Sequence, residues 1–134
     1  MARRASAAVF SVDYRLAPEH PFPAALDDTL AAYDWLVAEQ DVSPHRLAIA
    51  GDSAGGGLAL ALLQHLRAHN RPQPAAAVLY SPLLDLTFSG DSFEANRRRE
   101  VLFKPAAYRR AAEYYAVGVA NNDARARLAP IRAL

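Results

Sequence analysis

Residues 47–62 read Leu47-Ala48-Ile49-Ala50-Gly51-Asp52-Ser53-Ala54-Gly55-Gly56-Gly57-Leu58-Ala59-Leu60-Ala61-Leu62. A short apolar run is followed by a serine with a glycine two residues to either side, and then by an apolar run long enough for a helix. This is the spacing of a nucleophile elbow, in which a serine occupies a sharp turn between a buried strand and the next helix. Because so tight a turn brings positions 51 and 55 together, we expect both to require glycine or nearly so.

Glycine-rich turns that bind nucleotides are the main alternative. A dinucleotide fingerprint needs glycine at position 53, where this chain has serine, and a P-loop needs lysine after its last glycine, where Leu58 follows Gly57. Both patterns fail. Ser53 is therefore the candidate nucleophile, and the elbow around it consists of Gly51, Asp52, Gly55 and Gly56.

The composition is that of one ordinary globular domain. The chain has 134 residues, 52% hydrophobic and 22% charged, with a net charge of +1, which fits one modest domain. Its lack of cysteine excludes disulfides and thiolate metal sites. The basic residues near the C-terminus are too interspersed with Glu and Tyr to indicate a nucleic-acid-binding arm. No run approaches the ~18 apolar residues that span a bilayer, and no signal peptide is evident, so we expect a cytoplasmic protein.

Three short apolar runs, at residues 7–12, 46–51 and 75–80, predict buried parallel strands. Helical spacing of apolar residues begins at Ala24, and residues 54–68 are apolar almost all round, so both segments are predicted crossover helices of an α/β fold. Pro105 begins another predicted helix. Residues 121–134 have little periodicity, and we expect that the chain stops short of a complete domain.

Two motifs together go beyond a generic elbow. Val12-Asp13-Tyr14-Arg15-Leu16-Ala17-Pro18-Glu19-His20-Pro21-Phe22-Pro23-Ala24-Ala25 precedes Gly51-Asp52-Ser53-Ala54-Gly55-Gly56. At this spacing the pair resembles the hormone-sensitive-lipase-like family of α/β-hydrolases, which comprises carboxylesterases and lipases acting mostly on short acyl esters. The resemblance runs over nearly the whole chain and implies a partial α/β-hydrolase fold.

The resemblance also implies roles for particular residues. Ser53 would attack a small-molecule acyl ester and form an acyl-enzyme, and the N–H of Ala54 would be one oxyanion donor. The single incomplete domain would consist of a core segment at 1–88, a lid segment at 89–120 and an irregular tail at 121–134. Neither a metal nor a cofactor is implied.

The partners of the nucleophile are harder to find in this sequence. In this fold an acid and then a histidine follow the serine, but the histidines after Ser53 are His65 and His69, far along the next helix. We expect both to be surface residues, because they lie three to four turns from the serine at the C-terminal end of that helix, where the dipole favours a cation. A zinc site of the H-E-x-x-H type is excluded, since it needs Glu where Leu66 stands. The remaining polar candidates receive structural interpretations: Asp85 as a loop residue, Asp27 and Asp28 as helix-start charges, and His20 and His45 with no role as a base.

The family's His-Gly-Gly-Gly motif, which supplies the second oxyanion donor, would lie upstream of Met1. We therefore expect little or no ester turnover from this chain alone. The strand carrying that motif would separate the strands at 7–12 and 46–51, leaving them about 10 Å apart. Such exposed edges invite pairing with another chain, so we expect self-association. Two alternatives stay open: a non-catalytic remnant that binds a partner, and a related hydrolase acting on an amide, lactone or peptide.

Overall fold

The computed structural model describes residues 2–102 and 104–119. The predicted tail at 121–134 lies outside these residues. The elements in chain order are α1 (Ala2–Ala5), α2 (Ala24–Ala38), the 3₁₀ turn η1 (Pro44–Arg46), β1 (Ala48–Asp52), α3 (Ala54–Ala68), β2 (Ala76–Tyr80), α4 (Asp91–Ala95) and α5 (Pro105–Tyr115).

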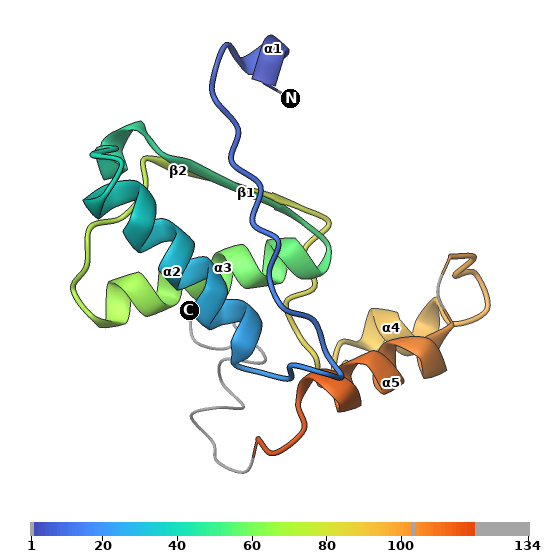
Figure 1. Ribbon diagram of the computed structural model, residues 1–134. Helices are drawn as coiled ribbons and strands as arrows, with labels where there is room; N and C mark the ends of the chain where they lie inside the picture. Colours follow the sequence, from blue (N-terminus) through green and yellow to red (C-terminus); the bar gives the residue numbers. More distant parts are fainter. Residues whose placement is uncertain (1, 103, 120–134) are drawn as a thin grey trace.

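The two strands form a parallel pair, as predicted for an α/β fold. Their register runs from Ala48 opposite Ala76 to Asp52 opposite Tyr80, and α3 connects them. Helix α3 lies against both strands and α2 lies alongside α3 (Figure 1). The predicted strand at 46–51 begins slightly later, because Pro44 starts a 3₁₀ turn that includes Arg46.

The predicted third strand at residues 7–12 is wrong for the described part of the chain. The sheet found there has two strands only, and Figure 1 shows residues 7–12 as an unpaired run between α1 and α2. Val9 and Phe10 are 58% and 53% exposed, and the Phe10 ring lies 5.4 Å from the ring of Trp35 on α2. An apolar run becomes a strand only when a neighbouring strand takes its backbone hydrogen bonds, and none of the described residues does so.

In the described part of the chain, helices cover one face of the sheet, so β1 and β2 are less buried than predicted. Ile49 and Leu79 are half-buried, whereas Val78 and Tyr80 are 59% and 71% exposed. Continuous apolar strands indicate covering layers on both faces. Among the described residues, only one layer of helices is present.

The core lies mainly between α2 and α3. Leu58, Leu62 and Leu66 recur every four residues and therefore share one face of α3, and Leu66 is fully buried. This face meets α2, where Tyr33 is buried and its hydroxyl donates a 2.6 Å hydrogen bond to the Pro72 carbonyl. These contacts fix the axis of α3, whose first residue is Ala54.

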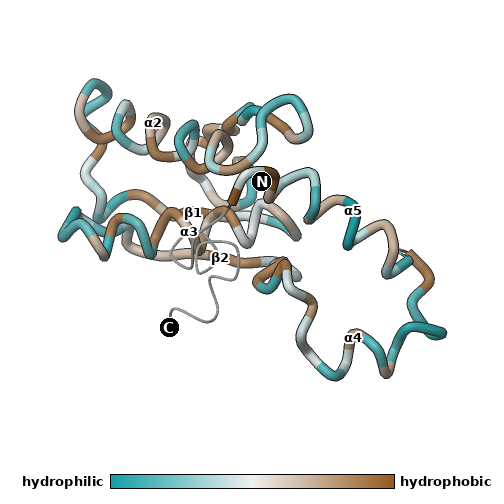
Figure 2. Tube along the Cα trace, turned by 90° about the horizontal axis from the view of Figure 1, so that it is seen from below, coloured by the Kyte–Doolittle hydropathy of each residue, from teal (hydrophilic) through white to brown (hydrophobic). Residues whose placement is uncertain are grey.

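Helices α4 and α5 lie next to each other and extend away from the sheet (Figure 1). The Phe88 ring lies 4.9 Å from the Phe93 ring of α4 and 6.0 Å from the Tyr108 ring of α5. At its other end α5 is held by the Tyr115 carbonyl, which accepts a 2.8 Å hydrogen bond from the Phe22 N–H. Figure 2 shows that the stretch following α4 is hydrophilic, as its arginine run requires.

Candidate active site

Ser53 occupies a sharp turn between β1 and α3, as the motif predicts. Its backbone angles are φ 52° and ψ −115°, a conformation that is uncommon for a residue other than glycine and costs free energy. The Ser53 N–H donates to the Tyr80 carbonyl at 2.9 Å, and its carbonyl accepts from Leu83 at 2.9 Å and Gly57 at 3.1 Å. Three backbone hydrogen bonds thus hold a strained residue whose side chain is exposed.

The two glycines that flank the serine are not equivalent. A Cβ on Gly51 would lie 2.1 Å from the carbonyl oxygen of Gly55 and 2.6 Å from the nitrogen of Gly56, so no side chain fits there. A Cβ on Gly55 would meet nothing within 4 Å. The expectation that both positions require glycine is therefore confirmed for Gly51 and wrong for Gly55, because the Cβ direction at 55 points away from the turn.

Gly56 and Gly57 allow α3 to approach the segment after β2 closely. A Cβ on Gly56 would lie 2.8 Å from the Pro82 side chain, and one on Gly57 would lie 2.3 Å from the Leu83 carbonyl oxygen. Gly57 was not singled out from the sequence. A third consecutive glycine inside a helix, where glycine is unfavourable, was the signal for this close approach.

The N-terminus of α3 is open toward the serine. The first N–H groups of a helix have no carbonyl partner within it, and the positive end of the dipole favours negative charge at this place. No side-chain hydrogen bond caps α3, so the Ser53 hydroxyl is not used as a cap. Asp52 and Ala54 on either side of the serine are exposed.

An apolar cavity of about 390 Å³ begins beside Ala54. It follows one face of α3 to Ala61 and is bordered by the loop before α2, the segment after β2 and α5. The residues that line it are Tyr14, Arg15, Leu16, Ala17, Ala25, Ala54, Gly57, Leu58, Ala61, Leu83, Leu86, Tyr108, Ala111, Ala112, Tyr114 and Tyr115. Such a lining suits an apolar group held next to the serine.

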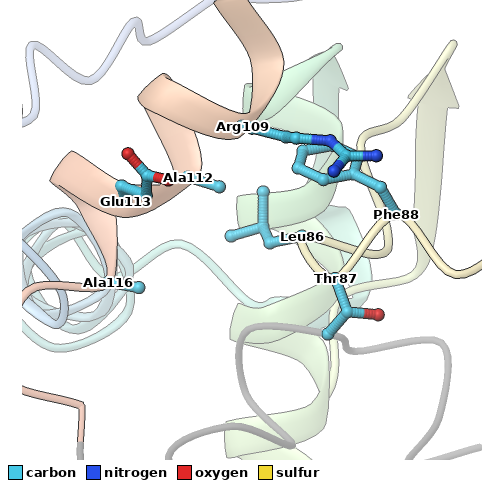
Figure 3. Close-up of a pocket in the computed structure, with 7 residues that line it drawn as sticks. All are labelled: Leu86, Thr87, Phe88, Arg109, Ala112, Glu113 and Ala116. Atoms are coloured by element: carbon cyan, nitrogen blue, oxygen red, sulfur yellow. The ribbon is translucent and has the colours of Figure 1, made fainter. Parts of the chain in front are cut away.

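A second, more open cavity of about 340 Å³ lies between α5 and the loop after β2 (Figure 3). Leu86 and Ala112 line both cavities. In Figure 3, Leu86 points toward Ala112, and Phe88 lies beside Arg109. Leu86 therefore belongs to the wall between the two cavities.

Asp85 is a structural loop residue, in agreement with its interpretation from the sequence. Its carboxylate accepts hydrogen bonds from the N–H and hydroxyl of Thr87, at 2.8 and 2.5 Å, and from those of Ser89, at 3.2 and 2.6 Å. Desolvation acts to raise the pKa of Asp85, but the hydrogen bonds from Ser89 and Thr87 outweigh it and lower the pKa to about 2. The group stays ionised at neutral pH.

His65 and His69 do not meet the serine: both lie near the far end of α3, with His65 half-buried and His69 exposed. His65 lies twelve residues after Ser53, which is about 18 Å along a helix. Its ring stacks on that of His69 at 4.1 Å, and Nδ1 of His69 lies 2.8 Å from the His65 carbonyl oxygen. No cluster of three or more metal-ligating side chains occurs in the described ranges.

Asp28 lies just after the first turn of α2, where Asp27 is the acidic residue, and it pairs with Arg15. The Arg15 side chain donates to both Asp28 carboxylate oxygens at 2.8 to 3.1 Å, and the Arg15 N–H donates at 2.8 Å. These side-chain and backbone hydrogen bonds lower the pKa of Asp28. They fasten the loop that lines the cavity to the N-terminal part of α2, a pairing that the sequence pattern does not reveal.

Comparison with known proteins places this geometry in a family. The model of a family described by its alpha/beta hydrolase fold matches residues 1–133. An acetyl-hydrolase of Streptomyces hygroscopicus is 51% identical over 114 residues, which are 85% of this chain and 38% of that protein. Carboxylesterase NlhH of Mycobacterium tuberculosis is 43% identical over 101 residues, which are 73% of this chain and 32% of that protein.

Solved structures agree. The hormone-sensitive-lipase homologue EstE7 from a metagenome library superposes with a TM-score of 0.87 at 41% identity, over 97% of this chain and 44% of that one. An esterase of the bacterial hormone-sensitive lipase family gives 0.82 at 42% identity, over 90% and 40%. The chain thus spans between 32% and 44% of the length of these relatives. No helix in the described part is long and apolar enough to cross a membrane. The chain belongs to the hormone-sensitive-lipase-like family of α/β-hydrolases.

Proposed function

We propose that this chain carries the nucleophile of a carboxylesterase and that Ser53 is that nucleophile. The observation that carries the proposal is that Ser53 is strained and exposed at the N-terminus of α3, which no side chain caps. Relatives named acetyl-hydrolase and carboxylesterase support an ester as the substrate.

In the proposed reaction the Ser53 oxygen bonds to the ester carbonyl carbon while its proton passes to a base. The carbonyl oxygen becomes an oxyanion, which accepts a hydrogen bond from the Ala54 N–H at the positive end of α3. The bond to the alcohol then breaks, the alcohol takes the proton and an acyl-serine remains. Water attacks the acyl-serine, releases the acid and restores the hydroxyl.

The apolar cavity beside Ala54 is the proposed acyl site. Helix α5 forms one of its walls through Tyr108, Ala111 and Ala112. Residues 89–120 are accordingly proposed as a lid segment and residues 1–88 as the core segment that carries the serine. The proposal involves no cofactor and no nucleic acid.

This chain alone should turn esters over slowly. The four histidines all lie in the described ranges, and none of them is hydrogen-bonded to Ser53 there; His65 is about 18 Å away by helix geometry. Loss of the histidine base in a related catalytic unit costs on the order of 10⁶ in kcat. The proposal therefore assigns the nucleophile and one oxyanion donor to these residues and is best tested by covalent labelling of the serine.

The test is reaction with an alkyl fluorophosphonate, in which the serine oxygen displaces fluoride from phosphorus, followed by peptide mass spectrometry. Ser81 is a matched internal control. It is also exposed, also follows a strand and also has a positive φ, of 43°, but Pro82 rather than a helix follows it. We expect Ser53 to be labelled at least about tenfold faster than Ser81, since only Ser53 faces an open helix N-terminus.

Ser53→Ala should abolish the labelling, and Ser81→Ala should leave it unchanged. Equal labelling of both serines would contradict the proposal. The complete absence of label on a folded chain would favour the second candidate, a non-catalytic partner-binding remnant. That candidate is supported by the exposed side chains of Val78 and Tyr80 on the open face of the sheet.

A further inference from the structure

The loop between β2 and α4 connects the serine turn to α5. The Ser53 N–H donates a hydrogen bond to the Tyr80 carbonyl, and the Ser53 carbonyl accepts one from the Leu83 N–H, both at 2.9 Å. The segment 80–83 is thus fixed to the turn that bears the serine. Asp85 follows Leu83 by two residues, so the turn that Asp85 holds has a fixed position relative to Ser53.

Hydrogen bonds to the Asp85 carboxylate hold a tight turn that has Phe88 near its centre. The carboxylate accepts hydrogen bonds from the N–H and the hydroxyl of both Thr87 and Ser89, the residues directly before and after Phe88. Phe88 has a φ of 52°, which is unfavourable for a bulky side chain. A turn with such a residue at its centre persists only when its surroundings hold it, and the flanking hydrogen bonds to the carboxylate do so.

The held turn presents two side chains to α5. Phe88 packs on Phe93 and on Tyr108 of α5, at ring distances of 4.9 and 6.0 Å. Leu86 points toward Ala112 of α5 (Figure 3) and lines the cavity that begins beside Ala54. One side of the turn therefore fastens α5 and the other closes the proposed acyl site.

We infer that Asp85 is a positioning residue for the acyl site: its carboxylate holds the 85–89 turn so that Leu86 forms the cavity wall and Phe88 fastens α5 over the cavity. The inference rests on the proposed function, because it takes this cavity to be the place where the acyl chain lies. Asp85 acts through Leu86 and Phe88 and does not touch the reacting atoms.

The first test is amide hydrogen exchange of the full chain with Asp85→Asn. The asparagine amide has one acceptor oxygen, and its NH₂ group cannot accept hydrogen bonds from Thr87 or Ser89. We therefore expect the turn to loosen. We expect exchange to rise about tenfold in residues 86–89 and in α5, and to stay unchanged in α2. Asp91→Asn is the matched control: it removes the same charge six residues away, from an exposed position at the start of α4.

A second variant keeps the test valid if Asp85→Asn unfolds the whole chain. Thr87→Val with Ser89→Ala removes the two hydroxyl donors and keeps the carboxylate and the backbone donors. It should loosen α5 in the same direction and to a smaller degree. Unchanged exchange in α5 in both variants overturns the inference, because Phe88 and its aromatic partners would then hold α5 unaided.

The second test separates positioning from a merely structural role. Ser53 is labelled with an ethyl and an octyl fluorophosphonate, of which only the octyl probe reaches along the cavity from Ala54 toward Ala61, about 10 Å of helix. In Asp85→Asn the octyl rate should fall severalfold while the ethyl rate stays the same. Equal changes in both rates, or no change in either, overturn the inference. If Ser53 takes no label in the parent chain, the proposed function fails, and hydrogen exchange still decides the role of Asp85.

Discussion

The turn at Ser53 should tolerate a methyl group on one flanking glycine and not on the other. In Gly51→Ala the new Cβ would lie 2.1 Å from the Gly55 oxygen and 2.3 Å from its carbonyl carbon. These are backbone atoms in the first turn of α3, which cannot rotate away as a side chain would. In Gly55→Ala the new Cβ meets nothing within 4 Å, and the residue lies inside a helix.

The structure sets the size of both effects. Overpacking that side chains can relieve costs about 1–3 kcal/mol. At Gly51 only a shift of the helix backbone relieves the overlap, so we expect a loss of at least about 3 kcal/mol in the free energy of unfolding. At Gly55, alanine has the better helix propensity and should add up to about 1 kcal/mol.

The assay is urea unfolding followed by Trp35 fluorescence. Trp35 lies on α2 beside Phe10 and is 38% exposed, so its emission should change when α2 leaves α3. All variants are compared at one chain concentration, because association shifts apparent stability by mass action. The reasoning is refuted if Gly51→Ala unfolds within about 1 kcal/mol of the parent, or if Gly55→Ala is as damaging as Gly51→Ala.

Four further outcomes follow from the packing and the charges. Leu66→Ala should lower the free energy of unfolding by about 2–5 kcal/mol, because it empties a fully buried site; a cost below about 1 kcal/mol in the same urea titration would contradict the core described. Tyr33→Phe should cost only about 0.5–1.5 kcal/mol, since it removes the 2.6 Å hydrogen bond to Pro72 and keeps the ring; a loss as large as that of Leu66→Ala would be inconsistent with this. The pKa of Asp85 is lowered from 3.8 to about 2 in the folded chain, so between these pH values the unfolded chain binds more protons. The stability that ionised Asp85 contributes is complete above the ordinary pKa and is lost as pH falls toward 2. Unfolding curves of Asp85→Asn should lack this part of the acid sensitivity. In sedimentation velocity the isolated chain should associate as its concentration rises, because no described residue pairs with the outer edge of β1 and because β2 exposes Val78 and Tyr80. A monomer at all concentrations with a sharp two-state melt would count against this.

Local pattern predicted the elements that carry the serine. The helix expected at 54–68 has those bounds in the structure, and the strands on either side of it pair in parallel. These segments combine a strong apolar period with clear glycine and proline boundaries, which are properties of the residues themselves. The turn at Ser53 followed from the same source, because few other sequences permit so tight a bend.

What failed depends on neighbours rather than on pattern. Residues 7–12 have the composition of a strand, but strand pairing needs a second backbone, and the described residues provide none. The asymmetry between Gly51 and Gly55 depends on the direction of two Cα–Cβ bonds in the folded turn, which spacing cannot reveal. The spacing of Asp85, Thr87 and Ser89 was open to interpretation as an Asx-type turn, but its link to α5 runs through the tertiary packing of Phe88.

The most direct measurement compares the rate at which a fluorophosphonate reacts with Ser53 in Gly51→Ala and in Gly55→Ala. If the cramped bend is what makes this hydroxyl reactive, Gly55→Ala should react at the parent rate and Gly51→Ala at least about tenfold more slowly. Equal rates in the two variants would show that the reactivity of the serine does not come from the turn.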